Sequence, residues 1–179
     1  MKSFILKILV KEGLYSNDKD DNGKETVYGI SRKYNPNWCG WKIVDKLKSN
    51  PKFPEIMSVN QNIYSAVLNY YKAKFDKMGI SELNDDDLQY RIFDAGVNIG
   101  IRTAIKHFQL SLNIINTKKT LLADGIIGKK TLKLFRELRE KKSYLIKNII
   151  KLINYYQTGY YISLGQDKYI NGWINNRIF

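Results

Sequence analysis

Apolar residues recur at helical spacing through most of this 179-residue chain. Near the N-terminus, Phe4, Ile5, Ile8 and Leu9 would share one helix face, and Gly13 stands where such a helix would end. The same spacing predicts further helices, over about residues 41–47, 57–78, 87–112 and 144–157 and from about residue 131. Residues 15–30 combine an Asn-Gly turn signal with strand-forming side chains. We therefore expect a mainly helical fold with a small β-hairpin.

Two short features should shape the helical part of the chain. The acidic run at residues 84–87 can cap the start of the next helix. Gly96 and Gly100, inside the helix predicted over residues 87–112, are spaced to allow close helix contact or a kink. With 44% hydrophobic content, the chain can bury a core as one domain or as two small lobes.

The formal net charge of +13 indicates an anionic partner, which could be nucleic acid, a membrane surface or a cell-wall polymer. Lysine greatly outnumbers arginine and is spread along the chain, which argues against base reading by bidentate arginine. A solvated lysine-rich surface without an anionic partner is the alternative. Charge alone does not choose among these interpretations.

Cys39 and His107 are single residues of their kind, which excludes an internal disulfide and a Cys/His zinc site. We expect no metal and no cofactor, and we expect Cys39 to be a small buried thiol between Trp38 and Trp41. The N-terminal apolar stretch is short and is broken by Lys7, so we predict no signal peptide and synthesis in the cytoplasm. The sequence also predicts no membrane span.

Glu12 lies four residues after Ile8 and seven after Ile5, so it falls on the apolar face of the first predicted helix. Apolar surroundings disfavour a charged carboxylate and raise its pKa, which suits a general acid. The alternative is a helix-end carboxylate paired with a nearby lysine, and periodicity by itself favours that alternative. The acidic loop after Glu12 has similar alternatives: turn-forming aspartates, or a calcium loop, although the EF-hand order of ligands is absent.

The stretch "EGLYSNDKDDNGKETVYGI", from Glu12 to Ile30, resembles the N-terminal signature of the glycoside hydrolase family 108 lysozymes. Further along, "FDAGVNIGIRTAIKHFQ", "ADGIIGKKTL" and "GWINNR" resemble the peptidoglycan-binding domain that accompanies this catalytic domain. Together these patterns cover nearly the whole chain. Leu14, Asn22 and Lys24 stand where the family has Gly, Pro and Gly, and these differences affect the expected loop shape.

The resemblance implies an N-acetylmuramidase that cleaves the β-1,4 bond between N-acetylmuramic acid and N-acetylglucosamine. It implies a lysozyme-like helical catalytic lobe at about residues 1–88 and a helical peptidoglycan-binding lobe at about 89–179. The catalytic glutamate of the family corresponds to Glu12. The spacing also resembles the Glu–Asp–Thr arrangement of the T-even phage lysozymes, which implies that Asp21, with Asp20 as the alternative, and Thr26 act as catalytic residues across the cleft. Residues expected to contact substrate are Asp20, Tyr28, Asn98 and Trp173. Trp38 and Trp41 could line the cleft, with core packing as the alternative.

The implied partner is peptidoglycan, with no nucleic acid and no stable membrane insertion, and the expected state is a monomer. The enzyme would act in the periplasm or cell wall, delivered by a holin or by export machinery. A phage-type endolysin and a secretion-associated muramidase both fit this pattern, as do retaining and inverting outcomes. A non-catalytic peptidoglycan-binding protein on the same fold is the remaining alternative.

Overall fold

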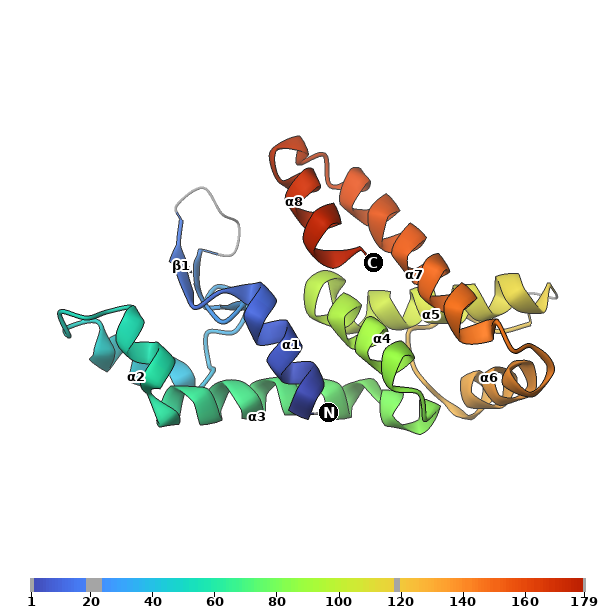
Figure 1. Ribbon diagram of the computed structural model, residues 1–179, viewed down its shortest axis with the longest axis horizontal. Helices are drawn as coiled ribbons and strands as arrows, with labels where there is room; N and C mark the ends of the chain where they lie inside the picture. The colour runs from blue at the N-terminus through green and yellow to red at the C-terminus, as the bar shows by residue number, and fades with distance from the viewer. Residues whose placement is uncertain (1, 19–23, 118–119, 179) are drawn as a thin grey trace. The chain divides into compact units, whose positions relative to one another are not determined.

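A computed structural model describes residues 2–18, 24–117 and 120–178 of the chain (Figure 1). It confirms a mainly helical fold with one small antiparallel sheet. The chain divides into two compact units, Met1–Lys74 and Phe75–Phe179. The lobe boundary expected after residue 88 is not the point at which these units divide, and it stays a prediction.

The first unit combines helices with the three-stranded sheet, in the strand order β1-β2-β3. Its elements are α1 (Lys2–Glu12), β1 (Tyr15–Asn17), β2 (Glu25–Val27), β3 (Ile30–Ser31), α2 (Gly40–Leu47), the 3-10 helix η1 (Glu55–Val59) and most of α3 (Gln61–Met78). The buried side of α1 supplies Ile8 to a core that also contains Val27, Ile30, Val44 and Val67, all fully buried. This core fixes the end of α1, and therefore Glu12, beside the sheet.

A two-residue turn joins β2 to β3. Val27 pairs with Ile30 across the turn, and the residues between them, Tyr28 and Gly29, have φ angles of 47° and 75°. Positive φ at both central positions is the geometry of a type I′ hairpin turn, whose twist matches that of the flanking strands. Because Tyr28 carries a side chain in this region, its backbone must be held by other contacts.

The second unit is built from helices around an aromatic and aliphatic core. Its elements are the end of α3, the 3-10 helix η2 (Ile80–Leu83), α4 (Asp86–Ile99), α5 (Ile101–Asn116), α6 (Lys129–Lys141), α7 (Leu145–Ser163) and α8 (Asp167–Arg177). Fully or almost fully buried Phe93, Phe108 and Phe135 lie at its centre, and the last two meet edge to face at 5.9 Å between ring centroids. The Asp85 side chain accepts a hydrogen bond from the Leu88 N–H, which confirms the expected acidic helix cap.

Two of the predicted long helices are interrupted. The helix expected over residues 57–78 is divided at Asn60, whose side chain accepts from the N–H groups of Asn62 and Ile63 and so starts α3. The helix expected over residues 87–112 is divided at Gly100, which has φ 88° and ψ 144°. Only glycine adopts that backbone conformation readily, so a full break replaces the kink that was allowed for.

A buried polar cluster ties α4, α7 and α8 together within the second unit. The Arg91 guanidinium is fully buried and donates to Asn154, Gln157 and Asp94. Arg177 of α8 reaches the same Asp94 carboxylate at 3.5 Å. A buried guanidinium is tolerated only where such partners replace its water shell, and here the partners come from the helices that the cluster links.

His107 should make the stability of the protein sensitive to acid. Its ring stacks on Tyr156 at 5.1 Å, and burial, followed by the positive charge of Arg91, lowers its pKa from 6.5 to about 4. The unfolded chain therefore binds a proton as the pH falls below about 6.5, whereas the folded chain does so only near 4.

We expect the wild type to lose about 2 kcal/mol more unfolding free energy between pH 7 and 4.5 than His107→Phe does, after a discount for partial exposure. Urea unfolding at the two pH values measures this difference. The variant keeps a ring for the stack on Tyr156 but cannot titrate. Identical losses in the two proteins would contradict the assignment.

Candidate active site

Glu12 is the last residue of α1, and Gly13, with φ 72°, turns the chain away from the helix directly after it. The Glu12 side chain is half-buried. It extends to the turn between β2 and β3, where a Cβ atom added to Gly29 would lie 2.4 Å from Glu12 Oε2. The carboxylate therefore rests on bare glycine backbone, in space that any other residue would occupy.

The turn beneath Glu12 is held from two sides. The Tyr28 N–H donates to the Leu14 carbonyl at 3.1 Å, and the Tyr71 hydroxyl donates to the Tyr28 carbonyl at 2.6 Å. Tyr71 comes from the middle of α3 and is 1% exposed, so its ring is fixed by packing. These contacts supply the support that the left-handed backbone of Tyr28 requires.

The same helix places an ammonium group and a second phenol in the electrostatic field of Glu12. Burial lowers the pKa of Lys74, and the negative charge of Glu12 partly opposes this effect. Burial raises the pKa of Tyr70, and the charge of Glu12 adds to the rise. The Lys74 Nζ lies 5.1 Å from the Tyr70 ring centroid, and the Tyr70 hydroxyl donates to Asn35 Oδ1 at 2.9 Å. The sequence did not predict that these α3 residues belong to the site: Tyr70 and Tyr71 were expected only on the apolar face of the helix.

The two tryptophans after the sheet differ in role. Trp41 is 3% exposed and donates from Nε1 to the Asn35 carbonyl, so it belongs to the core. Trp38 is half-buried and meets Trp41 and Tyr70 edge to face, at 5.1 and 6.3 Å between centroids. The expectation of a buried Cys39 is wrong: it is exposed, because it directly precedes α2 and the indoles beside it fill the interior.

The other predicted catalytic residues are placed only in part. Asp20 and Asp21 lie outside the described residues. Thr26 is the central residue of β2, where it pairs with Ser16 and Ser31, and it is half-buried between two fully or almost fully buried neighbours. Its role, like that of the aspartates, stays a prediction.

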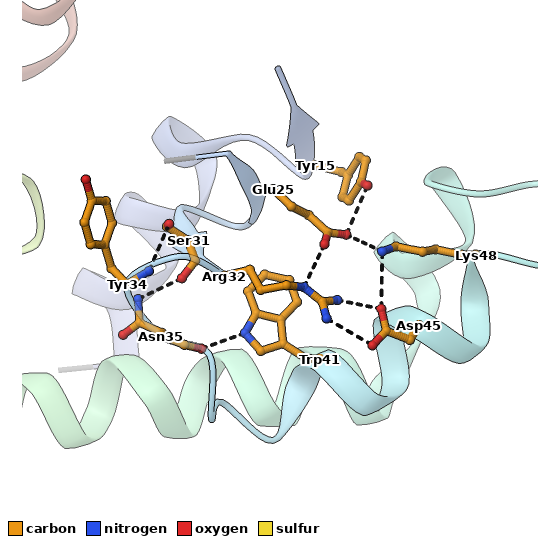
Figure 2. Close-up of polar contacts among 9 residues, drawn as sticks. All are labelled: Tyr15, Glu25, Ser31, Arg32, Tyr34, Asn35, Trp41, Asp45 and Lys48. Carbon is orange, nitrogen blue, oxygen red and sulfur yellow. Dashed lines mark hydrogen bonds and ion pairs between the residues drawn. The ribbon is translucent and has the colours of Figure 1, made fainter. Parts of the chain in front are cut away.

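Glu25 is a buried carboxylate in the same unit, and its contacts are ion pairs and a hydrogen bond to neighbouring side chains (Figure 2). Arg32 Nε lies 2.7 Å from one oxygen, and Lys48 Nζ lies 2.7 Å from the other, which also accepts from the Tyr15 hydroxyl. Arg32 and Lys48 both contact Asp45 of α2 as well. With a cation at each of its oxygens, Glu25 links the sheet to α2 through ion pairs.

Two predicted substrate contacts lie in the second unit. Asn98 donates its side-chain amide to the Asp94 carbonyl one turn earlier in α4, at 2.8 Å. Trp173 is half-buried in α8, with its ring 5.2 Å from that of Tyr161. Each has a structural contact within its own unit, and contact with substrate stays a prediction for both.

Across residues 2–18, 24–117 and 120–178, no group of three or more His, Cys, Asp or Glu side chains is arranged to hold a metal ion. None of the helices in those ranges combines the length and apolar character needed to cross a membrane.

Two known protein families match nearly the whole chain. Residues 5–100 match the family model described as glycosyl hydrolase 108, and residues 103–178 match the one described as a predicted peptidoglycan domain. A solved structure titled "Structure of Brucella abortus SagA" is similar, with a TM-score of 0.65 and 19% identity, and the match covers 98% of this chain and 90% of that one. At this identity the likeness shows the fold alone. No curated protein matches the chain.

Proposed function

The chain belongs to the glycosyl hydrolase 108 family, and on that premise we propose that it cleaves the β-1,4 bond between N-acetylmuramic acid and N-acetylglucosamine, with Glu12 as the general acid. The coarser activity follows from the two matches together: the protein is a glycoside hydrolase that acts on peptidoglycan. Its place of action is accordingly the cell wall or the periplasm. We propose delivery by a holin or by export machinery, as a phage-type endolysin or a secretion-associated muramidase.

The proposed role of Glu12 is supported mainly by the position of its carboxyl group on the Tyr28–Gly29 turn. A general acid must keep its oxygen within hydrogen-bond reach of the atom that it protonates, which here is the glycosidic oxygen. The absence of a side chain at Gly29 provides the space for the carboxyl, and the Tyr71 hydrogen bond to the Tyr28 carbonyl keeps the turn in place. This arrangement pre-positions the Glu12 carboxyl group, whereas the buried Glu25 carboxylate is fixed between cations.

Lys74 fits the charge change that the proposed reaction requires. When Glu12 gives its proton to the glycosidic oxygen, its carboxyl becomes negative. The ammonium of Lys74 lies within the electrostatic field of that carboxylate and favours the charged product of proton transfer. We propose that Asp21, or Asp20, acts on the opposite face of the sugar ring, with Thr26 holding a water molecule.

The chemistry of the released ends tests the proposed bond. Purified peptidoglycan is digested, the products are reduced with borohydride, and the fragments are identified by mass spectrometry. We expect every new reducing end to be N-acetylmuramic acid. Reduced N-acetylglucosamine ends, or release of free stem peptides, would assign the cut to a different bond and overturn the proposal.

A further inference from the structure

A preformed pocket of about 550 Å³ is lined by residues of the unit Phe75–Phe179, and none of the residues discussed above as catalytic is among its lining residues. It is bordered by the end of α3, the first turns of α5 and the loop at residues 125–127. Met78 and Ile105 give it an apolar floor and are 1% and 2% exposed. Ile126, which is 63% exposed, stands at its edge.

The loop that closes the pocket is held from the protein interior. Gln109 is 1% exposed, and its amide oxygen accepts from the Gly125 N–H at 2.8 Å. Its Nε2 donates to Asp124 Oδ1 and to the Ile126 carbonyl, at 2.9 and 3.0 Å. With these bonds in place, a ligand would meet the loop already in its final shape and would pay little ordering entropy.

The rim of the pocket is positively charged. Lys77 and Arg102 both line it with exposed side chains, and the lining includes no aspartate or glutamate. Arg102 Nε donates to the Asp124 carbonyl at 3.0 Å, and a Cβ on Gly125 would lie 2.4 Å from Arg102 Cγ. The stem of Arg102 is thus fixed against the loop, which holds its guanidinium at the rim. Such a fork matches the geometry of a carboxylate.

We infer that this pocket binds the stem peptide of peptidoglycan, with a carboxylate at Arg102 and Lys77 and an alanine methyl group on the apolar floor. The lining contains no aromatic ring on which a sugar face could stack. An uncharged glycan also has no anionic group that could form an ion pair with Lys77 or Arg102. Peptide carboxylates and methyl groups suit both parts of the pocket. The inference depends on peptidoglycan as the partner and not on catalysis by Glu12.

The test is calorimetric titration of full-length protein carrying Glu12→Gln, so that no substrate is turned over. The ligands are synthetic stem tetrapeptides with lysine or diaminopimelate at the third position, and, for comparison, a peptide-free N-acetylglucosamine oligosaccharide and a glycerol phosphate polymer. We expect one of the tetrapeptides to bind, and we expect Arg102→Gln and Ile126→Asp each to weaken its binding about tenfold or more.

Matched controls separate the pocket from general surface effects. Lys147→Gln removes an exposed charge from α7, and Ile162→Asp adds a carboxylate at a side chain that is 60% exposed, close to the exposure of Ile126. Both should bind the peptide as the parent does. Because Arg102 also holds the Asp124 carbonyl, Ile126→Asp tests the pocket without removing that contact.

Three results would overturn the inference: no tetrapeptide binding at millimolar concentration, equal weakening by the controls, or tighter binding of either comparison ligand. The muropeptide digest is a separate measurement on the wild type. If the peptide does not bind, the cleaved bond identified by the digest is unaffected. If the digest identifies a different bond, the calorimetric binding result is unaffected.

Discussion

Replacing Glu12 by Gln is expected to lower the rate of peptidoglycan hydrolysis by about 10³-fold or more. Glutamine has the size of the protonated acid and keeps the contact with Gly29, but its amide cannot give a proton to the leaving oxygen. The fold should be unaffected, because the side chain is half-buried at a helix end and outside the apolar core. Initial rates of clearing of a cell-wall suspension, together with the count of new reducing ends, measure the effect.

A matched variant shows whether the loss belongs to this position. Glu55→Gln makes the same chemical change at an exposed residue of η1 in the same unit, and it should keep the wild-type rate. If Glu12→Gln retained activity within tenfold of the wild type, the proton donor would have to be another group. A wild type that binds the wall but releases no reducing ends would favour the non-catalytic binding protein.

The sequence predicted several local features of both units well, because they depend on neighbours close in the chain. The apolar stripe from Phe4 to Leu9 and the stop at Gly13 are enough to place Glu12 at a helix end beside a hairpin. Capping by Asp85 follows equally from local chemistry. The breaks at Asn60 and Gly100 were missed because apolar periodicity continues across them, whereas the backbone does not.

The surroundings of Glu12 could not be predicted from its own neighbourhood. Tyr70, Tyr71 and Lys74 reach the site from a helix about 60 residues further along, and nothing in a single sequence pairs them with Glu12. The burial of Trp41 and the exposure of Cys39 likewise depend on how α2 is rotated against the core, which the composition of "NWCGW" leaves open.

Gly29→Ala is the second change for which we expect a large effect, a fall of about 100-fold in hydrolysis rate. The new methyl group would occupy a point 2.4 Å from Glu12 Oε2, so the carboxyl must move away from the position that the turn gives it. A displacement of about 1 Å is enough to cost two orders of magnitude in a reaction that depends on alignment. The left-handed backbone, with φ 75°, adds about 1 kcal/mol of lost stability.

Gly165→Ala separates displacement of the acid from backbone strain. Gly165 has a similar φ of 61°, but a Cβ there would have no atom within 4 Å. It should therefore lose a similar unfolding free energy while keeping the wild-type rate. Both variants are compared by urea unfolding and by initial rates at saturating substrate. Equal rates in the two variants would mean that the bare glycine under Glu12 serves only the turn, and that the acid does not depend on the space above it.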